Sequence, residues 1–285
     1  MKTPAIRRVG LVSRTDQVEA LRLARGLHDA LVKRGVEVIL ESEVAAKLKL
    51  EGVPLSRMDP DLLVVIGGDG TILRAAKTLP SSETPILGVK MGKTCFLGEV
   101  DPHEALRAIE LVLAGHYELE ENLKLRAIVG DLKVDVVNEV LLMTGQPAKV
   151  VKLKVEVEGE EVFEGLTDGV IVSTPTGSTG YALSAHGPII DPKVEAYLMV
   201  YLNPLNLGVR PLIVAAESVT TLRLEGPGPK ALLIADGEVI KELGEGSVVE
   251  VRRSPVKARF VRLRSGRGVF YSRLKDLMRR RGLRD

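Results

Sequence analysis

The sequence predicts a doubly wound, parallel α/β sheet followed by an all-β region. About the first 118 residues alternate short, wholly apolar runs with amphipathic segments, the pattern of parallel strands joined by helices. From about residue 120, apolar and polar residues alternate singly, which is typical of half-exposed antiparallel strands. At 285 residues the chain is also long enough for two cores, so we expect two domains.

The first region contains the elements of a parallel sheet. Apolar runs that predict strands buried on both faces lie at 9–12, 36–40, 62–66 and 86–89. Residues 16–34 carry apolar side chains at helical spacing, and Gly35 provides a C-terminal stop. A later helix is expected to begin at Asp101, because Pro102 suits its first position and Glu104 completes a capping box. Right-handed crossovers between such strands place ligands at their carboxyl ends.

The second region has the pattern of antiparallel strands. Apolar residues alternate with Lys and Glu through 151–157, and the chain turns at Gly159. Further short strands are expected at 169–174, 219–224, 231–235, 247–252 and 258–263, with turns at Asp236-Gly237 and Glu245-Gly246. This region therefore predicts an all-β domain. The last twenty residues carry apolar side chains at helical spacing and predict a helix that returns to the first domain.

Composition excludes several classes of protein. Hydrophobic residues make up 45% of the chain, but they form no run long enough to cross a bilayer, so no membrane partner is expected. A formal net charge of +2 argues against broad binding to nucleic acid. Cys95 is the only cysteine, which excludes an intramolecular disulfide and a cysteine-clustered zinc site. The N-terminus lacks the apolar region of a signal peptide, and we expect a cytoplasmic protein.

The stretch 61–77, DLLVVIGGDGTILRAAK, joins a buried strand to a helix through a turn that is almost bare backbone. Gly67, Gly68 and Gly70 expose successive backbone N–H groups, and a helix expected at 71–79 adds the positive end of its dipole. Such a concavity attracts phosphate. The turn is not a Walker A loop, because no Lys-Ser/Thr follows, and Leu73 stands where a dinucleotide fingerprint needs its third glycine.

Asp69 lies in the middle of this turn. A fixed carboxylate would repel phosphate, so its presence here favours a role in proton transfer or near a metal ion. Asp69 is therefore a candidate general base or a residue associated with Mg²⁺. An ordinary strand-to-helix turn with Asp69 as a local cap remains the alternative.

A second segment, TDGVIVSTPTGSTGYALSAHGP at 167–188, follows with a loop of small polar residues. Tyr181 could pack on a flat base. Hydroxyl groups that could bond sugar hydroxyls or phosphate belong to Ser173, Thr174, Thr176, Ser178, Thr179 and Ser184. Ser178 as a hydrolase nucleophile is disfavoured, because the glycine that an elbow needs two residues earlier is Thr176. The segment is therefore suited to binding a nucleotide.

Together these motifs resemble the NAD kinase family over nearly the whole chain. The resemblance rests on the Gly-Gly-Asp-Gly-Thr turn, Asn138-Glu139 in VDVVNEVLL, and the 167–188 segment. The glycine turn alone is shared with diacylglycerol, sphingosine and phosphofructo kinases. The Asn-Glu pair followed by Thr-Pro-Thr-Gly-Ser-Thr-Gly-Tyr is specific to NAD kinases.

The resemblance implies a reaction and an architecture. The family transfers the γ-phosphoryl group of ATP, or in some members of inorganic polyphosphate, to the 2′-hydroxyl of the adenosine ribose of NAD, with Mg²⁺ or another divalent metal. Its fold implies a Rossmann-like α/β domain at 1–118, a β-sandwich domain that binds NAD at 119–264, and a C-terminal helix at 265–285 that packs on the first domain. The family's substrate cleft lies between its domains, and its members form homodimers or homotetramers.

The resemblance also implies a role for individual residues. Asp69 would be the general base beside the 2′-hydroxyl. The phosphates of ATP would be held by Gly67, Gly68, Gly70 and Thr71. The NAD site would be lined by Gly70, Asn138, Glu139, Asp168, Thr179, Tyr181 and Ser184. Arg210-Pro211 and Asp236-Gly237 also match family positions, although a turn explains the second pair equally well.

One loop departs from the family's pattern. The segment GVKMGKTCFLGE at 88–99 has Lys90 in place of Asn, Thr94 in place of Leu and Cys95 in place of Gly. These changes leave open the choice of ATP or polyphosphate and the preference between NAD and NADH. They also keep a non-catalytic dinucleotide sensor as an alternative. A lipid or sphingoid kinase of the same superfamily is a further alternative, but it would need an apolar groove.

Overall fold

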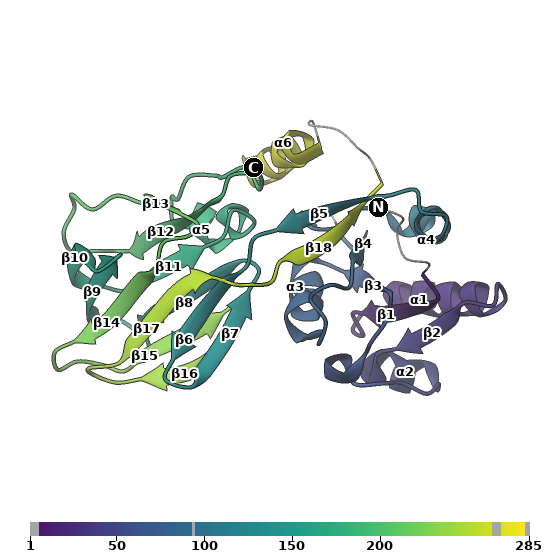
Figure 1. Ribbon diagram of the computed structural model, residues 1–285, viewed down its shortest axis with the longest axis horizontal. Coiled ribbons are helices and arrows are strands. Elements are labelled where there is room, and N and C mark those ends of the chain that lie inside the picture. Colours follow the sequence, from purple (N-terminus) through teal and green to yellow (C-terminus); the bar gives the residue numbers. More distant parts are fainter. Residues whose placement is uncertain (1–5, 93–94, 264–268, 283–285) are drawn as a thin grey trace. The chain divides into compact units, whose positions relative to one another are not determined.

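The computed structural model describes residues 6–92, 95–263 and 269–282. The chain divides into two compact units (Figure 1). The first comprises Met1–Glu121 together with Ala258–Asp285, and the second comprises Asn122–Lys257. The second unit is therefore an insertion within the first.

The first unit contains a six-stranded sheet in the order β2-β1-β3-β4-β18-β5. Its strands are β1 (Arg8–Ser13), β2 (Glu37–Leu40), β3 (Leu62–Gly67), β4 (Ile86–Lys90), β5 (Glu118–Asn122) and β18 (Ala258–Arg262). The pairs β1–β2, β1–β3 and β3–β4 are parallel, as the sequence predicts, and the pair β4–β18 is parallel as well. All six residues of β3 are buried, which fits a central strand covered on both faces. The carboxyl end of β3 is where the glycine turn begins.

The connecting helices are α1 (Val18–Val32), α2 (Ser42–Leu48), α3 (Asp69–Thr78), α4 (Ala105–Leu113) and α6 (Val269–Gly282), with short 3₁₀ turns at η1 (Leu55–Arg57) and η2 (Pro102–Glu104). In α1, Ala20, Ala24 and Leu27 form part of one buried stripe. The predicted capping box of Asp101 and Glu104 is present at η2. The sequence pattern missed α2, because its seven residues are too few to show a helical period.

The second unit contains two antiparallel sheets that enclose one core. The first sheet has the order β10-β9-β14-β17-β6-β7 and the second the order β13-β12-β11-β8-β15-β16. Their strands are β6 (Leu125–Val129), β7 (Leu132–Val136), β8 (Glu139–Thr144), β9 (Val151–Val157), β10 (Glu160–Thr167), β11 (Gly169–Ser173), β12 (Ala196–Leu202), β13 (Leu212–Ala215), β14 (Thr220–Glu225), β15 (Ala231–Ala235), β16 (Glu238–Leu243) and β17 (Val248–Arg253). Two short turns, η3 (Gly177–Thr179) and α5 (Tyr181–Ser184), follow β11.

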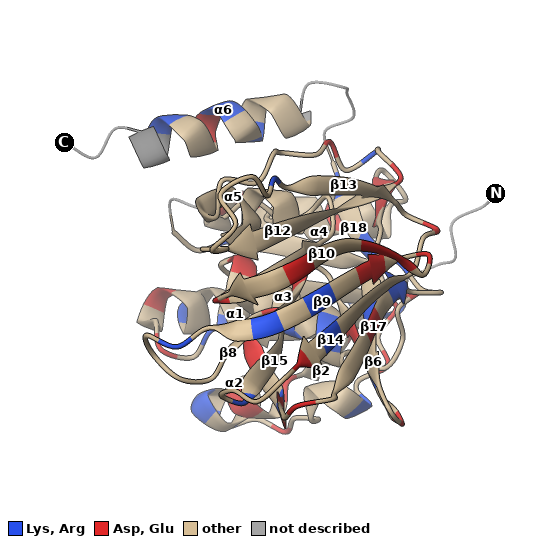
Figure 2. Ribbon diagram, turned by 90° about the vertical axis from the view of Figure 1, so that its left-hand side faces the viewer, with Lys and Arg blue, Asp and Glu red and all other residues tan. Residues whose placement is uncertain are grey.

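The outer face of β9 shows why the polar positions of these strands do not form a basic patch. Lys152 pairs with Glu164, and Lys154 lies between Glu156 and Glu161. Figure 2 shows blue and red segments interspersed on this face. Such exposed pairs contribute little stability each, but they balance the surface charge.

The strand at 258–262 corrects one expectation from the sequence. The pattern placed it in the all-β domain, but β18 belongs to the sheet of the first unit, where Phe260 pairs with Ile86 of β4. The reason is burial: Phe260, Val261 and Arg262 are consecutive and all buried, as in a strand covered on both faces. After β18 the chain continues into α6, whose Phe270 and Arg273 contact Phe96 of the first unit.

Candidate active site

The glycine turn lies at the carboxyl end of β3. Gly68 is the N-cap residue of α3, and Asp69 is the first residue of the helix. A Cβ atom at Gly67 would lie 2.5 Å from the Thr71 hydroxyl oxygen, so Gly67 is needed for close packing inside the turn. A Cβ at Gly68 or Gly70 would meet no atom within 4 Å. The first-turn N–H groups of α3 therefore lie beside open space, as a phosphate site requires.

The Asp69 carboxylate points away from its own helix. It accepts hydrogen bonds from the segment after β4. The N–H of Phe96 donates to Oδ2 at 2.9 Å, and the N–H of Leu97 donates to Oδ1 at 2.8 Å. The thiol of Cys95 also donates to Oδ1, at 3.3 Å. The alternative of a local cap is therefore wrong, and Asp69 is held in place by a second loop.

Cys95 contributes to this arrangement as a neutral donor. Burial, followed by the negative charge of Asp69, raises the pKa of the thiol to about 12. The thiol therefore keeps its proton at neutral pH and is inert as a nucleophile. Lys90 packs over the same loop, since a Cβ at Gly98 would lie 2.5 Å from its Cγ atom. Thr94 lies outside the described residues.

In the second unit, Asn138 and Glu139 stand at the start of β8, and their backbone is held by Asp236. The Asp236 carboxylate accepts the N–H groups of Val137, Asn138 and Glu139 at 2.8, 2.7 and 3.1 Å. Asp236 and Gly237 form the tight turn between β15 and β16, with φ values of 48° and 83°. The sequence correctly predicts this turn, but it does not reveal that the Asp236 side chain fixes a segment about a hundred residues earlier.

Glu139 is the most unusual carboxylate of the second unit. It is 8% exposed, and its Oε2 atom finds no hydrogen-bond partner in the described part of the chain. Burial, followed by the negative charge of Asp236, raises the pKa of Glu139 to about 7. A buried acceptor without a donor costs free energy, so Oε2 is suited to receive a donor from a ligand.

The end of β11 and the segment after it correct another expectation. Several hydroxyls expected to contact a ligand are instead hydrogen-bonded to backbone groups. Ser173, Thr174 and Ser178 are fully buried. The hydroxyl of Thr174 donates to the Val137 carbonyl, and the hydroxyl of Ser178 donates to the Pro175 carbonyl and accepts the N–H of Ile190. A buried Ser178 committed to backbone groups cannot be a nucleophile. These hydroxyls instead shape the loop.

The remaining residues of this segment differ in accessibility. Tyr181 and Ser184 are exposed on α5. Thr179 is almost buried, and its hydroxyl donates to the Thr176 carbonyl at 3.0 Å. A Cβ at Gly180 would lie 3.6 Å from the Asn138 amide nitrogen and 3.7 Å from Glu139 Oε2. The turn after β11 thus lies against the Asn138-Glu139 pair.

Asp168 does not lie with this group. It precedes β11, whereas Glu139 pairs with Ser173 at the far end of that strand. At about 3.4 Å per residue, the length of β11 separates the two positions. Asp168 accepts a hydrogen bond from the side-chain amide of Asn203 at 2.7 Å. Arg210 donates to the backbone carbonyls of Leu207 and Val209.

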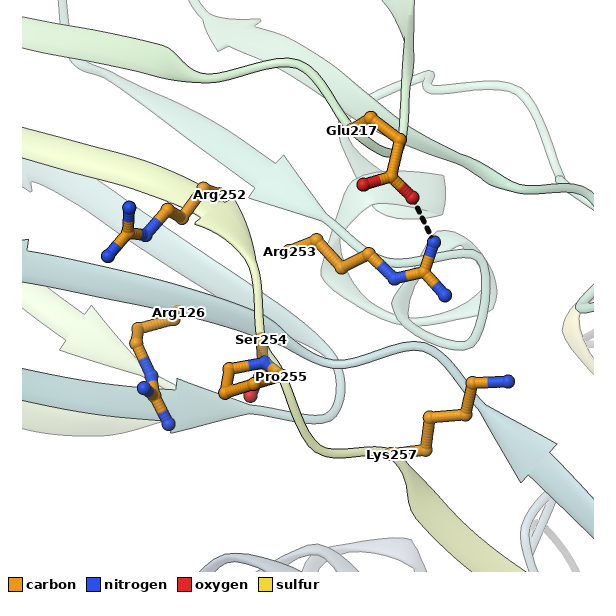
Figure 3. Close-up of a pocket in the computed structure, with 7 residues that line it drawn as sticks. All are labelled: Arg126, Glu217, Arg252, Arg253, Ser254, Pro255 and Lys257. Carbon is orange, nitrogen blue, oxygen red and sulfur yellow. Dashed lines mark hydrogen bonds and ion pairs between the residues drawn. The ribbon is translucent and has the colours of Figure 1, made fainter.

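A surface pocket of about 610 Å³ lies elsewhere on the second unit. Besides Glu217, Ser254 and Pro255, four basic side chains line this pocket (Figure 3): Arg126, Arg252, Arg253 and Lys257. Each of the three arginines pairs with a carboxylate, respectively on Asp135, Glu250 and Glu217. None of the site residues predicted from the sequence lines it, and its charges are largely neutralised internally.

Neither a metal-binding cluster nor a membrane-spanning helix is present among the described residues. No group of three His, Cys, Asp or Glu side chains in that part of the chain lies close enough to hold a metal ion. No described helix has the length and apolar character needed to cross a membrane.

Comparison with known families identifies both parts of the chain. The model of the ATP-NAD kinase N-terminal domain matches residues 9–117, and that of the ATP-NAD kinase C-terminal domain matches residues 137–263. The NAD kinase of Methanothermobacter thermautotrophicus is 40% identical over 94% of this chain and 95% of its own length. That of Thermococcus gammatolerans is 42% identical over 90% and 94%.

Solved structures agree with these matches. An NAD kinase from Archaeoglobus fulgidus in complex with ATP superposes with a TM-score of 0.75 at 26% identity, covering 95% of this chain and 98% of its own. Yeast NADH kinase complexed with NADH has a TM-score of 0.89 at 23% identity, covering 99% and 89%, and shows the shared fold. With the glycine turn and the Asn138-Glu139 pair in place, the chain belongs to the ATP-NAD kinase family, whose members phosphorylate NAD with ATP.

Proposed function

We propose that Asp69 is the general base in the transfer of the γ-phosphoryl group of ATP to the 2′-hydroxyl of the adenosine ribose of NAD. The observation that carries this proposal is the environment of the Asp69 carboxylate. It is held by three donors from one side, and the open backbone of Gly68 and Gly70 lies next to it in the chain.

The hydrogen-bond count indicates which oxygen takes the proton. A carboxylate offers about four lone-pair sites. Oδ1 receives both the Leu97 N–H and the Cys95 thiol, whereas Oδ2 receives only the Phe96 N–H. Oδ2 therefore keeps a site for the ribose hydroxyl. As the 2′-oxygen attacks the γ-phosphorus, its proton passes to Oδ2, the bond from phosphorus to the β–γ bridging oxygen breaks, and ADP leaves.

The glycine turn supplies the electrostatic part of the reaction. The first-turn N–H groups of α3 and the positive end of its dipole would hold phosphate oxygens at Gly67, Gly68, Gly70 and Thr71. Phosphoryl transfer depends on positioning and charge neutralisation, so a backbone cradle and one base form a sufficient protein contribution.

A divalent metal fits this site only together with the nucleotide. Mg²⁺ commonly binds through one or two carboxylates, substrate phosphates and several waters, and needs no cage made of protein alone. The absence of a three-ligand cluster among the described residues agrees with that mode. Because the remaining site on Asp69 Oδ2 is assigned to the ribose hydroxyl, Asp69, the only acidic residue of the turn, would hold the metal through its waters. When bound, Mg²⁺ would neutralise charge on the phosphates.

For NAD, the second unit provides the matching chemistry. Asn138 and Glu139 are held rigidly through Asp236, and Glu139 Oε2 would accept a donor from the ribose or the adenine. The exposed Tyr181 and Ser184 would contact the dinucleotide directly, while Thr179 would shape the turn that carries them. Asp168 remains a predicted NAD residue, at a position separate from this group.

A single set of incubations tests this function. Purified protein with Mg²⁺ is given NAD or NADH, each with ATP or polyphosphate, and the product is measured enzymatically. We expect NADP from NAD and ATP, whereas binding of NAD by calorimetry without NADP formation would favour the non-catalytic sensor. The same preparation, analysed by light scattering, tests the expected homodimer or homotetramer, and fractionation of cells tests the expected cytoplasmic location.

A further inference from the structure

A buried arginine, Arg262, and a partly buried one, Arg273, bind the segment that holds Asp69. Arg262 of β18 and Arg273 of α6 both bind the carboxylate of Glu99, which is 2% exposed. Arg262 also pairs with Glu120 at 2.7 Å. Two arginines and two glutamates thus form a balanced cluster, which is the condition under which buried charges are tolerated.

Arg273 reaches the peptide group that holds Asp69. Its Nη1 atom donates to the carbonyl oxygen of Phe96 at 3.2 Å. The N–H of the same peptide group belongs to Leu97 and donates to Asp69 Oδ1 at 2.8 Å. A charged donor at the carbonyl end of a peptide polarises the group, so its N–H becomes a stronger donor at the other end.

Arg262 acts on the next peptide group in the same way. Its Nη1 atom donates to the carbonyl oxygen of Leu97 at 3.3 Å. The N–H of that peptide belongs to Gly98 and is directed to the Cys95 thiol, which in turn donates to Asp69 Oδ1. Two successive peptide groups therefore carry the influence of two guanidinium groups to one carboxylate oxygen.

The docking of α6 depends on an aromatic contact beside this relay. The rings of Phe270 and Phe96 meet edge to face, with centroids 5.9 Å apart. Phe270 and Arg273 are three residues apart, so they lie on one face of the helix. Both are directed to the residue whose N–H binds Asp69 Oδ2.

We propose that Arg273, supported by Arg262 and Glu99, is a positioning residue for phosphoryl transfer, because it orients and polarises the peptide group between Phe96 and Leu97 that holds the Asp69 carboxylate. This inference rests on the proposed role of Asp69 as general base. It makes α6 and β18 contribute to catalysis through the loop that holds Asp69.

The test compares Arg273→Gln with Lys275→Gln, which removes an exposed cation from the same helix. We expect kcat of Arg273→Gln to fall about tenfold, the equivalent of one charge-assisted hydrogen bond, with the KM for NAD nearly unchanged. Lys275→Gln should leave both constants unchanged. Arg273→Lys should recover part of kcat, because an ammonium group can reach only one of the two acceptors at full strength.

A spectroscopic measurement separates this relay from a general loss of structure and from failure of the proposed function. In substrate-free protein, the Leu97 amide proton should move upfield in Arg273→Gln and stay in place in Lys275→Gln. An unmoved Leu97 resonance, or equal kcat losses in the two variants, would overturn the relay. Should Arg273→Gln fold poorly, the same resonance is followed in Arg273→Lys. Because this readout needs no turnover, it tests the relay even if Asp69→Asn shows that Asp69 is not the base.

Discussion

Asp69 in the first unit is a partly buried carboxylate and Glu139 in the second is a buried one, and their surroundings are opposite. Asp69 accepts two backbone N–H groups and one thiol. Glu139 has one oxygen without a partner among the described residues, and burial and Asp236 raise its pKa to about 7. The difference teaches how the two proposed roles differ: the proposed base is positioned by the protein before any ligand arrives, whereas the proposed binding group is left incomplete for a ligand to satisfy.

The largest effect should come from removing the negative charge of Asp69. In Asp69→Asn the ribose hydroxyl loses its proton acceptor, and kcat should fall at least about a hundredfold, or roughly 3 kcal/mol. Steady-state kinetics gives kcat, and calorimetry should show only a modest loss of NAD affinity. Near-normal turnover would show that Asp69 is not the general base, and its contrast with Glu139 would then not reflect a role in catalysis.

A change at Glu139 should weaken NAD binding and yet stabilise the protein. The carboxyl pKa is raised from 4.5 in the unfolded chain to about 7 in the folded one, so the folded state favours the protonated form. The destabilisation is absent below pH 4.5, grows as the pH rises, and is complete above pH 7. Glu139→Gln should therefore raise the free energy of unfolding at pH 8 by on the order of 2 kcal/mol and lose this advantage near pH 4.5.

Denaturant unfolding at several pH values measures this change, and the exposed Glu160→Gln serves as the control. The KM for NAD should rise about tenfold in Glu139→Gln, because the amide replaces the acceptor. Equal stability gains at pH 4.5 and pH 8 would show that Glu139 is not the group that titrates.

A third change tests how Asp236 supports Glu139. Asp236→Asn removes a negative charge and leaves one oxygen for three N–H donors. The free energy of unfolding should fall by about 1 to 2 kcal/mol, and the KM for NAD should rise more than kcat falls. The pKa of Glu139 should also move down, since one of its two causes is gone.

Asp131→Asn is the matched control, because Asp131 is exposed in another hairpin turn of the same unit. Kinetics and denaturant unfolding of both variants provide the comparison. If the two behave alike, the three bonds to Asp236 do not organise the Asn138-Glu139 segment.

The smallest expected effect concerns the open side of the glycine turn. Gly70 is exposed in the first turn of α3, and a Cβ there meets no atom of the protein. Gly70→Ala should stabilise the helix by about 0.5 to 1 kcal/mol. It should also raise the KM for ATP severalfold, because the methyl group enters the space assigned to phosphate.

Gly26→Ala in α1 has the same open surroundings and provides the control. It should give a similar rise in melting temperature without a change in KM. If the ATP KM is the same in Gly70→Ala as in the unchanged protein, the phosphates do not lie against this turn.

The sequence predicts features that depend on neighbouring residues. The glycine turn, the buried strands of the first sheet, the capping box at Asp101 and the Asp236-Gly237 turn all follow from local spacing. Features that depend on distant pairs were missed or misplaced. The pairing of Phe260 with Ile86 joins segments far apart in the chain, and the pattern of one strand does not indicate which strand it pairs with.

The candidate site shows the same limit. The hydroxyl groups after β11 suggest ligand contacts, but the structure uses Thr174 and Ser178 to bind backbone groups. Asp168 belongs to the same motif in sequence but directly precedes the strand at whose other end Glu139 lies. The hydrogen bond from the Val137 N–H to Asp236 joins residues 99 apart in the chain, and no local pattern predicts it.

The position of β18 has a consequence for how the protein is made. In the first sheet this strand lies between β4 and β5, although the ribosome reaches it last of the six. When synthesis reaches residue 258, that sheet still has a gap between β4 and β5, whereas all residues of the inserted all-β unit, Asn122–Lys257, have been made. The inserted all-β unit is therefore complete in sequence before the first sheet can close, so the proposed catalytic carboxylate lies in the unit that is completed last.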